Sequence, residues 1–508
     1  MFNFKKIFPF LLSVIIVLAM IFLVVSIVKS AYYYQYDYDE FMHVQKVYLI
    51  ATGFKPYTSF FFWFSSIFHR ILAPIFLFFG FSFATLGKAR IFMILLFAIR
   101  VFLTTLLIDK VFNRRTALLF IPLLLIDPFT IFSSMQIRPD NLMMTVYILG
   151  LLVFVIGFFR SSKSLLFISG MVFGLSFLTL IKIIPHLMIF FVMYGIYCIL
   201  NRKLNFFILL LDGFVLMLFL FCIYHLLNGS FLSMFSQVFI FSFTLPNQAI
   251  FIINQVPYGF FHLPNNGFIY GLMGKPLTWI YVWILPWLAS AGAYLTISNF
   301  VNNKRAKSGS FDKKKQLIQM ILVGSLVVQY LFLLNLTISF MQYYIPFQWL
   351  LAIFAAVVLD DFIFNKFSSG LSHQLIKGGL FVLFLALVYV SIKANNARSA
   401  FRFENQISQF TPIWSKVPKN AAVFPNILFR PIAYPLSVGD DQLNYYGTFS
   451  SVRNTFPKYI DSFEKNKAPY LLIDEPDKFY MIEPGLEKYV ENHYKKIDNQ
   501  INLYQRIK

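Results

Sequence analysis

The sequence predicts a polytopic α-helical membrane protein with about eleven transmembrane helices and a small α/β domain at its C-terminal end. Of its 508 residues, 58% are hydrophobic and only 13% are charged, and the mean hydropathy is +0.69. Apolar runs of about 20 residues recur along most of the chain, and each is long enough to cross about 30 Å of hydrocarbon. The composition therefore excludes a soluble multidomain enzyme.

The charges sort according to the expected topology. The net charge is +21, from 43 Lys and Arg against 22 Asp and Glu. Basic residues gather in short hydrophilic gaps: Lys5, Lys6, Lys110, Arg114, Arg115, Arg160, Lys163, Arg202, Lys203, the run 304–315, Lys366 and Lys377. By the positive-inside rule these gaps face the cytoplasm, so the basic excess indicates orientation and not a nucleic-acid partner. The first apolar run is too long for a signal-peptide core and is expected to remain as an anchor.

Alternating the basic gaps with the other breaks in the apolar pattern places the spans in order, with the N-terminus inside and the C-terminus outside. The expected spans are 7–29, 84–109, 116–133, 139–160, 164–181, 183–201, 204–227, 277–300, 317–340, 345–363 and 376–394. They form a transmembrane domain over 1–394.

Three longer pieces are expected on the extracytoplasmic side. The loop 30–83 contains an apolar stretch interrupted by polar residues, which is typical of a segment in the membrane interface. The loop 228–275 is rich in Pro and Asn and could cap a site. The segment 395–508 has a soluble composition, with a strand expected over Tyr470 to Ile473 and a helix near Gly485 to Lys496. It is predicted to be a small α/β domain.

Ionisable residues at span ends are the informative ones, because membrane interiors exclude charge. After the first span comes Asp39-Glu40-Phe41-Met42-His43, where helical spacing would put Asp39 and His43 on one face. An acidic loop capping a helix N-terminus is the alternative interpretation. Gly53-Phe54-Lys55-Pro56-Tyr57 follows in the same loop.

Further polar residues reach the same face from other spans. Arg138-Pro139-Asp140 begins the fourth span, and Lys182 stands between apolar residues where an unpaired cation would be costly. The alternatives are a helix start that suits Pro and Asp, and a lysine that snorkels to the interface. Gln342, Tyr343 and Tyr344 stand at the exit of the ninth span, where an aromatic belt is the alternative.

These residues carry a resemblance to a known family. The string Asp39-Glu40-x-x-His43, Gly53-x-x-Pro56-Tyr57, Arg138-Pro139-Asp140 and Gln342-Tyr343-Tyr344-Ile345-Pro346 resembles the GT-C glycosyltransferases. The chain is most similar to bacterial members of the family 39 group, which resemble protein mannosyltransferases and the lipid A aminoarabinose transferase. The resemblance covers the whole chain in topology, including a short extracytoplasmic C-terminal domain.

The resemblance implies a transferase that moves a sugar from a polyprenyl-phosphate carrier to an acceptor hydroxyl on the extracytoplasmic face. It assigns Asp39 as the catalytic base and Asp140 as the second acidic residue. The chemistry agrees, since an attacking hydroxyl needs a carboxylate to take its proton and a departing phosphate needs fixed cations. Arg138, Lys182, and Lys55 or Arg70 are suitable cations. The other expected substrate contacts are Glu40, His43, Tyr57, Gln342, Tyr343 and Tyr344.

One stretch departs from the family pattern. Many relatives carry Glu or His before a Pro-Leu step, whereas this chain reads Phe60-Phe61-Phe62-Trp63-Phe64 up to His69. An altered donor or acceptor pocket is expected, while a divalent metal and a compensating role for His69 stay open. A lipid or solute transporter, or a non-catalytic binder of lipid-linked glycans, are the alternative functions. The composition favours a bacterial inner membrane, and the acceptor could be a glycan, a glycolipid or a protein.

Overall fold

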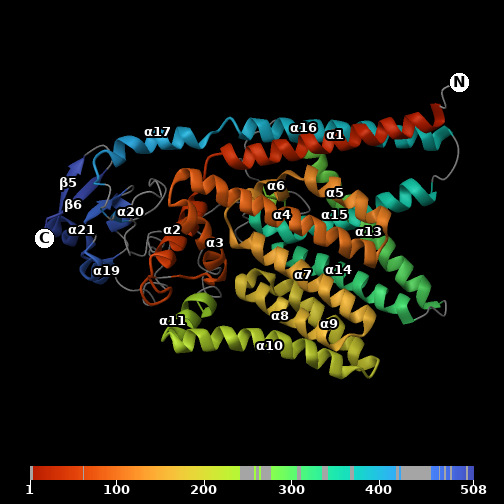
Figure 1. The fold of residues 1–508 in the computed structure, drawn as a ribbon, viewed down its shortest axis with the longest axis horizontal. Coiled ribbons are helices and arrows are strands. Elements are labelled where there is room, and N and C mark those ends of the chain that lie inside the picture. The colour runs from red at the N-terminus through yellow and green to blue at the C-terminus, as the bar shows by residue number, and fades with distance from the viewer. Residues whose placement is uncertain are drawn as a thin grey trace.

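The structure is a computed structural model that describes residues 4–60, 62–240, 257–258, 263–264, 276–305, 310–334, 341–366, 371–418, 421, 423–424, 459–467, 469–473, 476–480, 483–498 and 502–507. Long helices run side by side through the molecule (Figure 1). At one end of this bundle lie the short helices α2 (Tyr38–Ala51) and α3 (Ile67–Phe79), the helix α17 (Phe403–Trp414) and the C-terminal strands (Figure 1). The first turn of α1 (Phe4–Tyr33) lies at the opposite end. Most of the predicted loop 228–275 lies outside the described residues.

The helices of the bundle follow the apolar runs of the sequence. They are α1 (Phe4–Tyr33), α4 (Phe83–Val111), α5 (Arg114–Ile126), α6 (Pro128–Met135), α7 (Pro139–Arg160), α8 (Lys163–Thr179), α9 (Ile184–Leu200), α10 (Leu204–Leu227), α13 (Pro276–Arg305), α14 (Ser310–Leu334), α15 (Ile345–Asp360) and α16 (Leu371–Arg398).

Shorter elements connect the bundle helices and build its polar end. The helical ones are α2 (Tyr38–Ala51), α3 (Ile67–Phe79), α11 (Phe231–Phe235), α17 (Phe403–Trp414), the 3-10 turns η1 (Ile181–Ile183) and η5 (Met341–Tyr344), and the π turns η2 (Ser236–Ile240) and η6 (Asp361–Lys366). A two-residue pair, β1 (Pro257–Tyr258) and β2 (Leu263–Pro264), is antiparallel.

Nine helices in the described part of the chain are long and apolar enough to cross a membrane. They coincide with nine of the eleven predicted spans, which confirms a polytopic membrane protein. The predicted span 164–181 is the helix α8, whose 17 residues fall short of a full crossing length. The predicted span 116–133 is divided into α5 and α6. Asp127 ends the first and caps the second by accepting a hydrogen bond from the Thr130 amide, with Pro128 at the first helical position.

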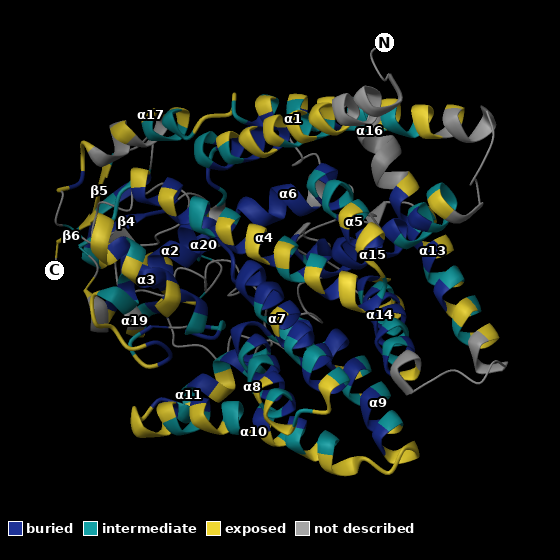
Figure 2. Cartoon of the chain, turned by 45° about the vertical axis from the view of Figure 1, so that its right-hand side comes forward, coloured by how far each residue is buried: buried dark blue, intermediate teal, exposed yellow. Residues whose placement is uncertain are grey.

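The helix α7 forms the centre of the bundle. Figure 2 shows it buried along most of its length, whereas α1, α10 and α16 expose one side. Large apolar side chains cover the outer sides, and Phe102 on α4 and Phe219 on α10 are more than half exposed. Such surfaces are stable when lipid chains cover them, which agrees with an integral membrane protein.

The C-terminal part is a small α/β domain, as predicted. Its strands β3 (Val423–Phe424), β4 (Tyr470–Leu472), β5 (Tyr494–Asp498) and β6 (Leu503–Arg506) form a sheet of order β3-β4-β6-β5, in which only the β3–β4 pair is parallel. The helices α19 (Tyr459–Asn466), α20 (Pro476–Tyr480) and α21 (Leu486–His493) accompany it. The strand expected at Tyr470 is confirmed. The helix expected near Gly485 ends at His493, and the chain continues as β5.

Candidate active site

The helix α2 begins with a capping box at the polar end of the bundle. The Asp37 carboxylate accepts a hydrogen bond from the Glu40 amide at 2.9 Å, and the Glu40 carboxylate accepts one from the Asp37 amide at 3.1 Å. This exchange satisfies two donors that a helix start leaves without partners. By fixing the start of α2, it also sets the direction of the Asp39 side chain in the first turn.

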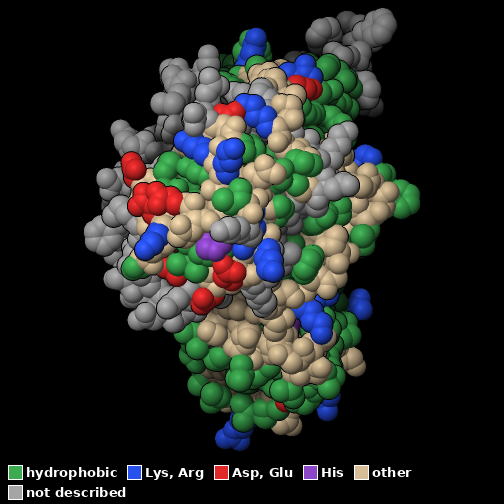
Figure 3. Space-filling model, turned by 90° about the vertical axis from the view of Figure 1, so that its left-hand side faces the viewer, with side chains coloured by type: hydrophobic (Ala, Val, Ile, Leu, Met, Phe, Trp, Pro, Cys, Tyr) green, Lys and Arg blue, Asp and Glu red, His purple; other side chains and the backbone are tan. Residues whose placement is uncertain are grey.

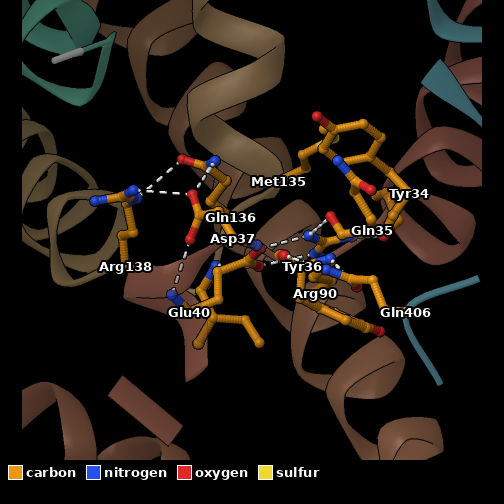
Figure 4. A network of polar contacts seen from close by, with 12 residues as sticks. Tyr34, Gln35, Tyr36, Asp37, Glu40, Arg90, Met135, Gln136, Arg138 and Gln406 are labelled. Carbon is orange, nitrogen blue, oxygen red and sulfur yellow. Dashed lines mark hydrogen bonds and ion pairs between the residues drawn. The ribbon is translucent and has the colours of Figure 1, made fainter. Parts of the chain in front are cut away.

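Glu40 faces the interior and pairs with a cation from α4. Its side chain and that of Arg90 are fully buried, and Arg90 Nε donates to Glu40 Oε1 at 2.8 Å. The same carboxylate oxygen accepts a hydrogen bond from the Ile137 amide at 3.0 Å. Glu40 therefore ties α2 to α4 and to the turn before α7 (Figure 4). The structure places this predicted substrate contact inside a buried ion pair.

Arg138 joins two carboxylates of the α2 segment. Its guanidinium forms ion pairs with Asp39 and with Asp37, the latter at 2.9 Å, and Gln136 donates to the same Asp37 oxygen at 2.6 Å. The Arg138 side chain is 9% exposed, while Asp37 and Asp39 are 31% and 30% exposed. Burial opposes the charge of Arg138, but Asp39, Asp37 and Asp140 outweigh it and raise the pKa of the guanidinium. Arg138 stays a cation at the edge of the interior.

Lys182 forms a second ion pair beside the first. It lies in the turn η1 between α8 and α9, and its ammonium is 3.2 Å from Asp140 Oδ1 in the first turn of α7. The ammonium also lies over the Tyr343 ring, 4.0 Å from its centre. The pairing explains how a lysine is tolerated between apolar residues. It also brings three of the predicted site residues together from different helices.

Two histidines lie against each other behind these ion pairs. His43 Nδ1 and His69 Nε2 are 3.0 Å apart, and both rings are buried. Burial lowers the pKa of each well below 6.5, and the charges of Arg138, Lys182 and Lys46 lower that of His43 further. Both rings are therefore neutral near pH 7, and one donates a hydrogen bond to the other. His43 therefore lies within electrostatic reach of Arg138 and Lys182, the cations of the two groups of ion pairs.

The Phe-rich stretch surrounds this histidine pair. The ring centre of Phe62 lies 4.7 Å from that of His69, and the ring centre of Phe64 lies 5.0 Å from that of His43. Apolar rings thus pack against both imidazoles. Within the described residues, His, Cys, Asp and Glu form no group of three or more that could hold a metal ion.

Other predicted residues lie apart from the ion pairs. Lys55 is exposed, and Tyr57 is buried among apolar residues, donating to the Phe64 carbonyl at 3.0 Å. Tyr344 is buried in the main apolar core. Gln342 is also buried, at 7% exposure, in the turn that carries Tyr343. Arg70 lies over the Tyr224 ring at 5.3 Å.

Three residues that build the site were given no role on the basis of the sequence. Asp37 shares Arg138 with Asp39, Gln136 bonds to Asp37, and Arg90 neutralises Glu40. An available signal was the three-residue separation of Asp37 and Glu40, which is the pattern of a capping box. No comparable local pattern marks Arg90, because its partners lie about 50 residues away in the chain.

Comparisons with solved structures cover nearly the whole chain. ArnT from Cupriavidus metallidurans, in a crystal structure bound to undecaprenyl phosphate, is 13% identical with a TM-score of 0.59, and the match covers 99% of this chain and 98% of ArnT. The apo oligosaccharyltransferase of Archaeoglobus fulgidus is 12% identical with a TM-score of 0.55, over 94% of this chain and 72% of that protein. Both are GT-C glycosyltransferases. The chain has the GT-C fold.

The GT-C resemblance seen in the sequence is thereby confirmed at the level of the fold. No family model matches the sequence, and no curated protein matches it. In this GT-C fold the paired charges lie at the end of the bundle that also carries α17 and the C-terminal strands. Figure 3 looks onto that end and shows Lys, Arg, Asp and Glu side chains gathered over its upper part.

Proposed function

We propose that this protein is an integral-membrane glycosyltransferase that moves a sugar from a polyprenyl-phosphate donor to an acceptor hydroxyl. The GT-C fold supports the class of reaction. ArnT is bound to undecaprenyl phosphate in one of the similar structures, and the archaeal oligosaccharyltransferase is tethered to an acceptor peptide in another, which has a TM-score of 0.54. The acceptor here is a glycan, a glycolipid or a protein.

The observation that carries the proposal is the set of paired charges at one end of the bundle. Asp37 and Asp39 share Arg138, and Asp140 holds Lys182. Transfer needs both signs together. The acceptor oxygen attacks the anomeric carbon, its proton goes to a carboxylate, and the bond from that carbon to the phosphate oxygen breaks, leaving its electron pair on the polyprenyl phosphate.

In this proposal Asp39 is the base and Arg138 and Lys182 bind the phosphate. Asp39 is about a third exposed, so an acceptor can approach it. Arg offers paired donors that fit phosphate oxygens, and Lys offers a compact charge. Asp140 is the second acidic residue and positions Lys182. Tyr343, which lies beneath Lys182, and His43, which is paired with His69, are the other proposed substrate contacts.

We also propose the side of the membrane on which the site lies. Lys110 and Arg160, in the last turns of α4 and α7, and Lys203, between α9 and α10, lie at the other end of the helices that carry the site. Such basic ends favour the cytoplasm. The site and the domain 395–508 would then be extracytoplasmic, most simply at a bacterial inner membrane. The helix α16 continues to Arg398 through the expected boundary at 394, so it would lead directly into that domain.

Replacing Asp39 with Asn tests the assignment of the base. The amide keeps the size of the side chain but cannot take the proton, so transfer should fall by about 10²- to 10⁴-fold. The measurement is mass spectrometry of lipid extracts and envelope glycans from cells in which the native gene is deleted. These cells express the wild type, the variant or neither. Cells that express the wild type should carry one additional sugar on a glycan. Cells without active protein should lack that sugar and should accumulate the polyprenyl-phosphate donor.

The control is Asp109→Asn, at an exposed position near the end of α4 away from the site, which should leave transfer unchanged. Full transfer by Asp39→Asn would reject Asp39 as the base. Unchanged glycans with a lipid or solute redistributed across the membrane would instead support a transporter. Donor binding without turnover by the purified wild type would support a non-catalytic binder.

A further inference from the structure

Residues 34–36 lie between the end of α1 and Asp37, the N-cap of α2, and their backbone groups are all hydrogen-bonded. The Tyr34 amide bonds within α1 to the Ser30 carbonyl at 3.0 Å. The carbonyls of Tyr34 and Gln35 accept hydrogen bonds from Arg90, the latter at 2.9 Å. This accounts for half of the six backbone groups of residues 34–36, and the partners are bundle helices.

The remaining three groups bond to a segment far along the chain. The Gln35 amide donates to the Phe401 carbonyl at 2.8 Å. Gln406 holds both backbone groups of Tyr36, because its Oε1 accepts from the Tyr36 amide and its Nε2 donates to the Tyr36 carbonyl, each at 2.8 Å. The Gln406 side chain thus makes the two hydrogen bonds to the Tyr36 backbone that a neighbouring β-strand would otherwise make. Figure 4 shows Gln406 reaching Tyr36 from the α17 side.

The residue that Gln406 holds comes directly before Asp37. Asp37 caps α2 and shares Arg138 with Asp39. A single peptide bond therefore separates the residue that Gln406 holds from the first of the paired charges. Aromatic packing supports the same contact, since the ring centre of Phe403 lies 5.9 Å from that of Tyr36. No group in this contact needs to touch a substrate.

The segment is also continuous with the C-terminal domain. After α17 the chain reaches Val417, which is buried with Tyr470, Leu472 and Leu503 of the sheet. Lys416 forms an ion pair with Asp498 at the end of β5. The helix α17 therefore connects the sheet on one side with the turn before Asp37 on the other.

We propose that Gln406 is a positioning residue for transfer: its side-chain amide fixes the Tyr36 backbone and thereby holds Asp37 and Asp39 in register with Arg138. This inference rests on the proposed glycosyltransferase function. Its physical basis is that a displacement of about 1 Å at a reacting group can cost about 10²-fold in rate. The C-terminal domain, through α17, becomes part of the active-site scaffold.

The test compares Gln406→Met with Asn405→Ala in the full-length protein. Methionine has a similar length and packing but lacks both hydrogen-bonding atoms, whereas Asn405 is exposed on the same helix and serves as the control. Purified proteins are assayed for kcat and KM with the polyprenyl-phosphate sugar that accumulates in cells lacking the protein, and with the glycan from those cells as acceptor. Amide hydrogen exchange is followed at Gln35 and Tyr36. Melting temperatures report whether either variant loses its fold.

For Gln406→Met we expect kcat to fall roughly 10- to 100-fold while KM for the donor changes little, because Lys182 and Arg138 lie on other elements. Exchange at Tyr36 should become faster, while Gln35, bound to the Phe401 carbonyl, stays protected. Asn405→Ala should match the wild type in all readouts. Wild-type kcat in Gln406→Met, or unchanged exchange at Tyr36, would overturn the inference, whereas an inactive wild-type protein would overturn the proposed function itself.

Discussion

The neutral histidine pair has a consequence for stability at the scale of single residues. Burial lowers the pKa of His43 and His69 in the folded protein, and Arg138, Lys182 and Lys46 lower that of His43 further. In the unfolded chain the pKa of each histidine is about 6.5. Below that pH the unfolded state binds more protons than the folded one, so stability rises with pH through this window and falls on acidification.

We therefore expect the thermal midpoint of the purified protein to fall as the pH drops from 7 to 5. Each histidine can contribute up to about 1.4 kcal/mol per pH unit. In His69→Asn, which removes one of the two rings, the midpoint should depend less steeply on pH in this range. Above pH 7 the two curves should run parallel, because neither ring is protonated in either state. Equal slopes below pH 6 would refute the neutral pair.

At the scale of secondary structure elements, glycines decide how closely α8 and α10 approach. A Cβ atom at Gly170 would lie 2.0 Å from the Leu210 carbonyl oxygen, and one at Gly213 would lie 2.0 Å from the Phe167 carbonyl oxygen. Gly174, one turn after Gly170, faces Met217 in the same way at 2.8 Å. Gly170 and Gly174 form the small-xxx-small pattern that lets helix backbones touch within a membrane.

Substituting alanine at Gly213 should separate these helices. Overpacking of this kind typically costs about 1 to 3 kcal/mol, so the melting temperature in detergent should drop by several degrees. Gly378→Ala is the matched control, because nothing lies within 4 Å of a Cβ at that position on α16. It should be neutral or stabilising, as alanine favours a helix over glycine by about 1 kcal/mol. A stable Gly213→Ala protein would contradict the close crossing.

Sequence patterns predicted the elements and part of the site for an identifiable reason. Asp39, Arg138, Asp140 and Lys182 stand at helix ends, and alternating spans bring those ends to one side, where the structure pairs them. Gln406 could not be predicted, because its partner lies 370 residues away and a glutamine on an amphipathic helix has no distinctive spacing. Apolar-run counting likewise passed over the break between α5 and α6, although an Asp-Pro step at 127–128 signals one.

At the scale of the whole molecule, helix hairpins separate two chemical environments. The helices α4, α7, α9, α13 and α15 lead away from the paired charges, and the helices that follow them return. Basic turns at the far end include Arg160 before α8 and Arg202 before α10. A cation-rich end favours the cytoplasm, so in the proposed orientation the basic end faces inward and the end that carries both signs of charge faces outward.

Cysteine labelling tests this orientation. In a background carrying Cys198→Ala and Cys222→Ala, single substitutions are made at Ser408, exposed on α17, and at Asn201, exposed between α9 and α10. A membrane-impermeant maleimide should label Ser408→Cys in intact spheroplasts and Asn201→Cys only after permeabilisation. The reverse pattern would place the paired charges in the cytoplasm and contradict an extracytoplasmic acceptor. The expected pattern places Asp39, Arg138 and Lys182 on the extracytoplasmic side, together with α17 and the C-terminal domain.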